Sequence, residues 1–411
     1  MITNKTVKTI GAMALTVGLT TVAQAQTDIY ITGSTAFRAQ VFAGLADLGL
    51  GNAQGSANNA NQFTFSGTIS NPHSISNLPS GLVGQSVVVF CSWSGSAEGV
   101  QQLISPGPAI YDSNAVSGTF NHNGADLAFS DVAQYSTPEA GSSDQLTEIQ
   151  TAADSQLPEG TGIAVQAFAF VGNSNAFTTL GIKNITQDNF LDVFESGKFA
   201  ASYLNGVTAD TNVDIYPVGR YNLSGTRITS VEDDNGDLDD TATPLKQYAL
   251  STDGVTAPGL NSTDTSPVPS GSSANQWVAV GDSGYFSGGN VGAAIHNGSL
   301  AGAPAAIAYI GWADAQSKLT DTTHEGPITW QGQTPGKQGA WNLAGVEVGA
   351  YNFWSYERLY HADAATSFIV NTFGPGLIEA IQYEIVNTSP RTAILESEMH
   401  VVRANDGADP L

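Results

Sequence analysis

Two periodic patterns of apolar and polar residues alternate along the chain, one typical of strands and one typical of helices. Short apolar runs predict buried strands, as in "DIYI" (28–31), "SVVVF" (86–90) and "GIAVQAFAFVGN" (162–173). Between them, apolar residues recur at helical spacing, as in "AFRAQVFAGLADLGL" (36–50) and "TQDNFLDVFES" (186–196). Strands that alternate with helices predict an α/β fold rather than a β-sandwich.

The second half of the chain continues this alternation. "NVDIYPVGR" (212–220) predicts a strand, and "AAIAYIGWADA" (305–315) predicts a strand that passes into a helix. "EVGAYNFWSYERLYH" (347–361) has the alternation of a strand, and residues 364–385 form a helix-rich end. Residues 50–82, 106–123 and 232–287 are rich in small and polar residues. We expect a long surface excursion or a small hairpin over 50–82, a loop over 106–123 and mostly irregular chain over 232–287.

The net charge of the chain and its N-terminal residues limit the kinds of protein this can be. The chain has 37 acidic and 13 basic residues, a net charge of −24, which argues against nucleic acid as a partner. Lys5 and Lys8 precede an apolar stretch and the Ala-Gln-Ala motif that ends at Ala25. This pattern is typical of a signal peptide over residues 1–25, so we expect a periplasmic or secreted protein.

Cysteine and histidine give no sign of a metal site or a disulfide framework. The single cysteine, Cys91, follows a predicted strand, which favours a buried thiol. The histidines lack the paired spacing of metal ligands, so we expect neither a metal nor a cofactor.

Small hydroxyl residues recur where predicted strands pass into helices. The three turns are Thr32-Gly33-Ser34-Thr35, Ser94-Gly95-Ser96 and Ser224-Gly225-Thr226. Asp131 is the last residue of "DLAFSD" (126–131), which predicts a further strand. In α/β folds, ligands bind at the carboxyl ends of strands, against helix N-termini that offer free N–H groups. Each residue alone is more often an ordinary helix cap, but three such turns with the same chemistry suggest a shared ligand.

The ordered motifs "ITGSTAF", "SGSAEGVQQL", "ADLAFSD", "GRYNLSGTRI" and "AIAYIGWADA" resemble the periplasmic phosphate-binding proteins of ABC transporters. The resemblance covers most of the chain. It implies a two-lobed type II periplasmic-binding fold with a ligand cleft between the lobes. Lobe one would comprise residues 26–162 and 352–411, and lobe two residues 163–351 with an insertion at about 232–287. Crossovers would lie near Gly162 and Tyr351.

Carried over position by position, the resemblance implies a set of phosphate-binding residues. Asp131 would accept a proton that phosphate carries and sulfate lacks at neutral pH, and Arg220 would make charge-assisted contacts. The complete set is Ser34, Thr35, Ala36, Ser96, Asp131, Arg220, Ser224, Gly225 and Thr226.

The chain departs from the family pattern at several places. Arg38 stands where the first loop usually continues to proline, and we expect it to be exposed to solvent. Asn222-Leu223 replaces an Asp-Gly pair, so close backbone approach by glycine is lost at one place. Glu98 would be unfavourable beside an anion unless it pointed to solvent.

The expected function is therefore capture of inorganic phosphate by a monomeric, non-enzymatic solute-binding protein that serves an ABC transporter permease. Two alternatives stay open. One is a secreted phosphatase or esterase on the same scaffold, which would need a metal cluster or an activated nucleophile. The other is a non-transport envelope or phosphate-sensing protein.

Overall fold

The computed structural model describes residues 26–52, 61–112, 119–143, 145–151, 162–232, 244–253, 257, 259–260, 273–320, 325–335, 342–403 and 406. The expected signal peptide and the acidic run at 233–240 lie outside these residues. Where the chain is described, no helix has the length and apolar character needed to cross a membrane.

One continuous mixed sheet runs through the molecule, in the order β11-β12-β15-β9-β17-β7-β1-β4-β3-β2, with β10, β16 and β8 attached at its sides. Strands β5 and β6 form a separate two-stranded sheet, and so do β13 and β14. The strands are β1 (Thr27–Gly33), β2 (Gly51–Asn52), β3 (Gln62–Thr68), β4 (Ser86–Ser92), β5 (Pro108–Asp112), β6 (Thr119–Asn123), β7 (Leu127–Ser130), β8 (Thr147–Glu148), β9 (Ala164–Gly172), β10 (Asn184–Ile185), β11 (Phe199–Ala200), β12 (Asp214–Val218), β13 (Gln247–Ser251), β14 (Gln276–Gly281), β15 (Ala306–Gly311), β16 (Gly326–Trp330) and β17 (Trp354–His361).

Helices cover both faces of this sheet, so the expected α/β class is confirmed. The α-helices are α1 (Arg38–Asp47), α2 (Ser96–Ile104), α3 (Gln187–Ser196), α4 (Ser202–Asn205), α5 (Gly225–Glu232), α6 (Gly288–Leu300), α7 (Trp312–Lys318), α8 (Ala344–Glu347) and α9 (Gly374–Asn387). Short 3₁₀ and π segments are η1 (Gln134–Ser136), η3 (Asn175–Thr179), η4 (Thr208–Asp210), η5 (Ile369–Phe373) and η6 (Glu396–Glu398).

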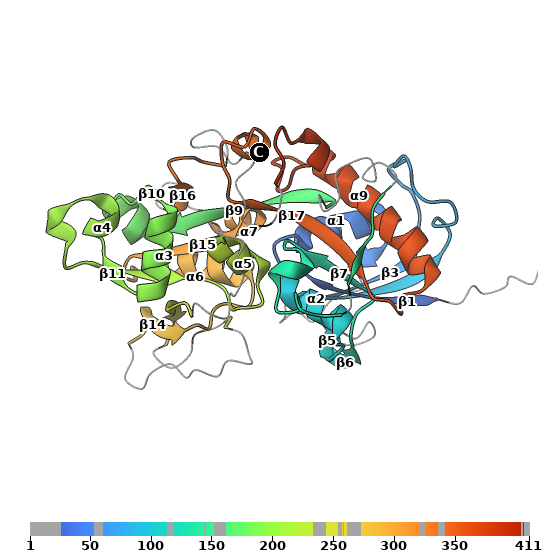
Figure 1. The fold of residues 1–411 in the computed structure, drawn as a ribbon, viewed down its shortest axis with the longest axis horizontal. Helices are drawn as coiled ribbons and strands as arrows, with labels where there is room; N and C mark the ends of the chain where they lie inside the picture. Colours follow the sequence, from blue (N-terminus) through green and yellow to red (C-terminus); the bar gives the residue numbers. More distant parts are fainter. Residues whose placement is uncertain are drawn as a thin grey trace, which may run out of the picture.

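The molecule has two lobes, and strands β9 and β17 pass between them (Figure 1). Residues Trp354–Glu357 of β17 pair with β9, whereas residues Arg358–His361 pair with β7 of the first lobe. The far half of β9 pairs with β15 of the second lobe. Each connecting strand therefore changes partner part-way along its length. The lobe boundaries named above remain a prediction.

Alternation along β7 shows how the first lobe builds its core. Leu127 and Phe129 pack into the hydrophobic cluster that includes residues of α1 and α9. Ala128 points the other way and packs with Val100 and Leu103 of α2. Successive side chains of a strand face opposite sides, so one strand holds helices on both faces. Cys91 is fully buried in β4, as expected.

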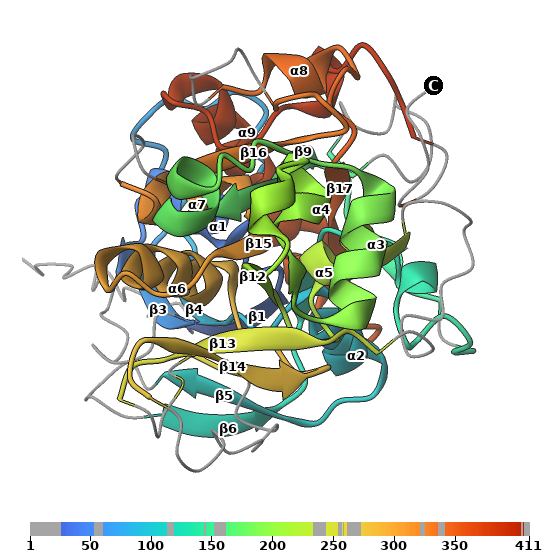
Figure 2. The same ribbon diagram turned by 90° about the vertical axis from the view of Figure 1, so that its left-hand side faces the viewer.

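The second lobe has its own core around β9, β12 and β15. Helix α6 lies to one side of these strands and α3 to the other (Figure 2). Helix α3 begins with a capping box, in which Thr186 accepts from the N–H of Asn189 and the Asn189 side chain accepts from the N–H of Thr186. Phe190 and Phe194 of α3 pack against Tyr309 of β15.

All three segments rich in small and polar residues contain strands. Within 50–82, β2 pairs antiparallel with β3, and β3 pairs along its length with β4. Within 106–123, β5 and β6 pair antiparallel, and Tyr111 of β5 packs with Tyr30 and Phe90 on the outside of the sheet. Within 232–287, β13 and β14 form a second antiparallel pair. The expectation of a loop over 106–123 is therefore wrong, and the described part of 232–287 is more regular than expected, because each of these strands is stabilised by an antiparallel partner.

Candidate anion site

The first two hydroxyl-rich turns lie side by side at the carboxyl ends of β1 and β4. Gly95 N–H donates to Gly33 O (3.0 Å), and the Thr32 and Ser94 hydroxyls are 3.1 Å apart. Gly33 has a φ of +116°, and a β-carbon there would lie 1.9 Å from the Phe129 carbonyl oxygen. Only glycine fits this approach, which brings Ser34 N–H to within 2.8 Å of the same oxygen.

Asp131 lies at the centre of the site, directly after β7, and is almost fully buried. The Ser96 hydroxyl donates to its Oδ1, and the Ser34 hydroxyl donates to its Oδ2 over 3.4 Å. Two of the predicted hydroxyl residues therefore point at the predicted carboxylate. Ser96, expected to donate to the anion, donates to Asp131 in this state.

Burial raises the pKa of Asp131 to about 6, while the hydrogen bond from Ser96 and the charge of Arg220 act in the opposite direction. Asp131 therefore titrates near neutral pH. An ionised carboxylate accepts hydrogen bonds and does not donate them. A bound anion would have to bring its own proton to be favourable beside it.

The third turn approaches Asp131 from the second lobe. A β-carbon at Gly225 would lie 1.6 Å from Asp131 Oδ1 and 2.7 Å from Ser96 Oγ. Gly225 is the first residue of α5, and the Ser224 hydroxyl accepts from the N–H of Arg227 at 3.4 Å, as in an ordinary helix cap. Thr226 is buried beside them. The N-terminus of α5 thus points at the carboxylate.

Arg220 enters the site from the segment after β12 and is 1% exposed. Its Nε donates to Tyr285 O (3.1 Å), and its Nη2 donates to Phe286 O (3.0 Å). In the part of the chain that the structure describes, no carboxylate oxygen lies within 4.0 Å of its nitrogens. Burial lowers the pKa of Arg220, and Asp314 and Asp131 are among the groups that act in the opposite direction. A buried guanidinium held only by carbonyls is poorly compensated.

Thr35 and Ala36 complete the predicted set where the two lobes meet. The Thr35 hydroxyl is buried and has no hydrogen-bond partner among the residues that the structure describes. A β-carbon at Gly311 would lie 3.0 Å from Ala36 Cβ, so the start of α1 touches the end of β15. Both residues line a pocket of about 450 Å³ that also includes Asp314 and Lys318 of α7. Thr35 is therefore a buried hydroxyl free to bind a ligand.

Direct contacts join the lobes around the site. The N–H of Ala97 donates to Leu223 O (3.2 Å), and the Tyr221 hydroxyl donates to Glu98 Oε2 (2.9 Å). Glu98 is therefore turned to a partner in the other lobe rather than to solvent. Burial raises the pKa of Glu98, and its hydrogen bond with Tyr221 acts against this shift.

Arg38 corrects the expectation of an exposed side chain. It is 14% exposed, donates from Nη1 to Asn61 Oδ1 (2.6 Å), and its Nη2 lies 3.6 Å from Asp314 Oδ1. Asp314 belongs to α7 of the second lobe, so this ion pair also bridges the lobes. Both partners are distant from Arg38 in the sequence, so its burial could not be predicted from the local pattern.

The segment "GDSG" (281–284) supports the site in a way that its sequence did not predict. Gly281 is the last residue of β14, and the chain turns at Asp282. A β-carbon at Gly284 would lie 2.3 Å from the backbone carbon of Arg220, so glycine lets this turn lie against Arg220. Asp282 pairs with the fully buried Arg227 of α5 at 2.6 Å. In the sequence, the role of this segment is indicated only by glycines beside an acidic residue, Asp282.

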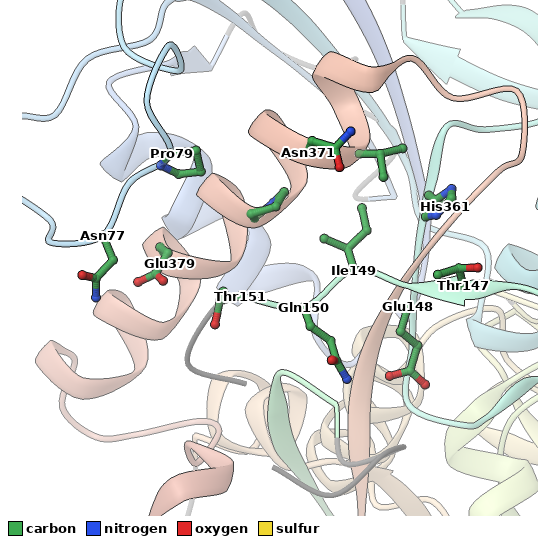
Figure 3. A pocket seen from close by; sticks show the side chains of 12 residues that line it. Asn77, Pro79, Thr147, Glu148, Ile149, Gln150, Thr151, His361, Asn371 and Glu379 are labelled. Atoms are coloured by element: carbon green, nitrogen blue, oxygen red, sulfur yellow. The ribbon is translucent and has the colours of Figure 1, made fainter. Parts of the chain in front are cut away.

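A second pocket, of about 680 Å³, lies in the first lobe away from these residues (Figure 3). Its lining includes Glu148 of β8, His361 of β17 and Glu379 of α9. None of the predicted site residues lines it. Over the described ranges, no group of three or more His, Cys, Asp or Glu residues is arranged to hold a metal ion.

No protein-family model matches the sequence, and no curated protein matches it. Three solved structures resemble it at low identity. A protein assigned as a phosphate ABC transporter substrate-binding protein, with bound phosphate, from Clostridium perfringens is 13% identical, with a TM-score of 0.47 over 90% of this chain and 99% of that one. An ABC-type phosphate transport receptor from Vibrio cholerae is 12% identical, with a TM-score of 0.39 over 85% and 93%. A protein assigned as phosphate-binding from Planctomyces limnophilus is 12% identical, with a TM-score of 0.35 over 87% and 93%. Proteins of this kind are the ones that the five sequence motifs resemble.

Proposed function

We propose that this protein is a solute-binding protein that captures inorganic phosphate between its two lobes and passes it to an ABC transporter permease. The observation that carries the proposal is Arg220, a buried guanidinium with no carboxylate within 4.0 Å among the described residues. A buried positive charge of this kind is stabilised by an anion.

In this proposal, Asp131 distinguishes phosphate from anions that carry no proton. Its carboxylate lies at the centre of the same site and repels an anion that has no proton to share. Hydrogen phosphate and dihydrogen phosphate donate to it, whereas sulfate at neutral pH does not. A site built to receive such a proton rejects an analogue that lacks it by about 10⁴-fold.

The remaining charge of the anion is balanced by neutral dipoles. Helices α1, α2 and α5 begin beside the site, and each N-terminus offers roughly half a positive charge. The hydroxyl and N–H groups at Thr35, Ser224 and Thr226 supply donors. An acidic chain therefore binds an anion through buried dipoles and one guanidinium, while its surface charges are screened by salt beyond ~8 Å.

Calorimetric titration of the ligand-free protein tests the proposal. The protein is unfolded, dialysed and refolded to remove carried-over ligand, and then titrated with phosphate and, separately, with sulfate. We expect one-to-one binding of phosphate and no heat with sulfate. Arg220→Ala removes binding, whereas the control Arg391→Ala, which breaks a partly exposed ion pair with Glu398, leaves it unchanged. Absence of binding to phosphate by the unmodified protein would refute the proposal.

Transport is separated from sensing or scavenging by a second experiment. Uptake of labelled phosphate into cells that carry the protein and its permease should depend on Arg220, as the binding does. Uptake that is unchanged by Arg220→Ala would contradict a transport role while leaving phosphate binding intact. The expectation of a non-enzyme is tested by release of phosphate from a phosphate ester, which this protein should not catalyse.

A further inference from the structure

A carboxylate near the end of the chain binds the segment that follows Asp131. Asp406 Oδ2 accepts hydrogen bonds from the N–H of Ala133 (2.5 Å) and from the Ser136 hydroxyl (2.7 Å). All three residues are buried, with exposed fractions of 5% or less. Asp406 lies 273 positions after Ala133 in the sequence, so no local motif indicates this contact.

Strand β17 supports the other side of Asp131. Arg358 of β17 is the register partner of Ser130, the residue before Asp131. The Nη1 atom of Arg358 also lies 3.2 Å from Asp406 Oδ1, and both side chains are buried. Asp131 is therefore supported on both sides, by the pairing of Ser130 with β17 and by the bond from Ala133 to Asp406. The Arg358–Asp406 ion pair joins these two supports, and its burial makes the loss of either partner costly.

Arg403 anchors the end of the chain on β17 as well. Its guanidinium donates from Nη1 to Trp354 O (2.7 Å) and from Nη2 to Asn352 O, and it lies 4.3 Å from the centre of the Trp354 ring. The backbone N–H of Arg403 donates to the Tyr356 hydroxyl at 3.1 Å. The chain end thus contacts β17 independently of Asp406, which limits where the Asp406 carboxylate can lie.

We propose that Asp406 is a positioning residue of the anion site. By binding residues 133 and 136, it fixes where the Asp131 carboxylate lies. The Ser34 and Ser96 hydroxyls donate to that carboxylate, so a displaced Asp131 would lose the alignment of both bonds. Binding groups are kept in productive geometry by supporting hydrogen bonds of this kind. The role toward a ligand rests on the proposed function, whereas the support of the segment after Asp131 does not.

Hydrogen exchange of the ligand-free protein tests the support of this segment. Asp406→Ala removes the acceptor, so we expect amides of residues 131–136 to exchange about tenfold or more faster, while those of β1 and β4 keep their rates. Asp406→Asn keeps an oxygen acceptor, and its exchange should stay within about threefold of the unmodified protein. Both variants remove the negative charge of Asp406, so a difference between them reports on the acceptor.

Three results of the exchange experiment would overturn the proposal. One is an unchanged rate at residues 131–136 in Asp406→Ala. Another is an equal increase in Asp406→Ala and Asp406→Asn, which would assign the effect to the lost charge. The third is an increase that extends equally to β1 and β4, which would show a general loss of stability.

Glu325→Ala is the matched control. Glu325 is also a buried carboxylate, and its oxygens lie 2.9 and 3.1 Å from Nδ1 of His296. His296 belongs to α6, and Glu325 directly precedes β16. Its replacement should lower stability without changing exchange at residues 131–136 or the preference for phosphate. A change in either would show that loss of any buried carboxylate has the same effect, and would overturn the specific role of Asp406.

Titration with phosphate and sulfate gives a readout that a merely structural role would not change. A displaced Asp131 would receive the ligand proton less well and repel sulfate less. Asp406→Ala should therefore bind phosphate about tenfold or more weakly, and the ratio of phosphate to sulfate affinity should fall. Asp406→Asn should bind phosphate within about threefold of the unmodified protein. Unchanged affinity and ratio in Asp406→Ala would overturn the positioning role.

The two experiments separate this proposal from the function on which it partly rests. If the unmodified protein binds no phosphate, the proposed function fails. Hydrogen exchange then still decides whether Asp406 supports the segment after Asp131. If the unmodified protein binds phosphate and Asp406→Ala binds it equally well, the function stands and the role of Asp406 is refuted.

Discussion

Gly225 and the Asp131 carboxylate are in such close contact that a β-carbon at position 225 would lie 1.6 Å from Oδ1. Asp131 follows β7 and Gly225 begins α5 after β12, so this contact joins the two lobes. A side chain at 225 would hold them apart, because the neighbouring Ser96 hydroxyl lies within 2.7 Å of the same position. This contact between the lobes therefore depends on the absence of a side chain at position 225.

We expect Gly225→Ala to bind phosphate roughly 100-fold more weakly than the unmodified protein, since closure would require Asp131 and Ser96 to move. Calorimetry measures the affinity, and small-angle X-ray scattering measures whether the lobes still close with phosphate. Gly141→Ala is the control, because a β-carbon there meets nothing within 4 Å. Normal affinity in Gly225→Ala would mean that the closed contact is not part of binding.

Arg220→Met should separate binding from stability. The apolar side chain removes the buried charge, and phosphate affinity should fall by roughly 100-fold or more. The ligand-free protein should be no less stable than the unmodified one, because the cost of burying an unpaired guanidinium disappears together with its two bonds to carbonyls. Urea denaturation without phosphate measures this, and a large loss of stability would show that Arg220 is mainly structural.

Asp131→Asn should relax the discrimination between phosphate and sulfate. The amide removes a negative charge and can donate to an unprotonated oxyanion, so sulfate binding should become measurable while phosphate binding weakens. Competition between the two anions gives the ratio. Asp363→Asn, which removes the same charge from an exposed position, should leave the ratio unchanged. An unchanged ratio in Asp131→Asn would remove the selecting role from Asp131.

Asp131 should also make the stability of the ligand-free protein depend on pH. Its pKa in the folded chain is about 6, above the ~3.9 of an exposed aspartate, so the folded chain binds this proton more tightly than the unfolded chain. The resulting stability is fully present below about pH 4 and is lost as the pH rises through 6, a difference of about 3 kcal/mol.

Urea denaturation at pH 4, 6 and 8 checks this sign. As the pH rises, the unmodified protein should lose up to about 3 kcal/mol of unfolding free energy relative to Asp131→Asn. Taking the difference between the two proteins cancels the titration of the other carboxyl groups. A difference that stays constant from pH 4 to pH 8 would show that Asp131 has an ordinary pKa.

Tyr221→Phe should weaken the closed state modestly. The variant removes the hydroxyl that donates to Glu98 across the lobes at 2.9 Å, but keeps the stacking of the ring on Phe286. A single hydrogen bond to a charged group contributes about 1.5–3 kcal/mol, so phosphate affinity should fall by roughly 10- to 100-fold. Unchanged affinity would show that this contact does not stabilise closure.

The sequence predicted those parts of the site that depend on local pattern. Apolar runs located β1, β4, β7 and β12, and the Gly-Ser and Ser-Gly turns after them located the helix starts. These signals are local, because a strand end, a glycine of positive φ and a cap are properties of a few adjacent residues. The structure brings Ser34, Ser96, Asp131 and Gly225 together, which their order along the chain suggested only through a resemblance.

What the sequence could not predict depends on distant contacts. Glu357 lies within an aromatic strand pattern, and only the packing of two lobes against β17 shows that its carboxyl group is fully buried. Arg227 and Asp282 are far apart in the chain and meet behind α5. Strands β13 and β14 lie in a segment dominated by small and polar residues, and each is stabilised by pairing with the other. Burial of a charge is a property of the whole fold, which composition and spacing do not encode.

The shared strands β9 and β17 also affect how the molecule loses its structure. Each strand contributes backbone hydrogen bonds to both lobes, so melting one lobe removes an edge partner from the other. The two lobes are therefore coupled as a single cooperative unit, although each has a core of its own. A ligand that reaches only the space between them consequently raises the melting temperature of both, and protects amides in β1 and β15 alike from hydrogen exchange.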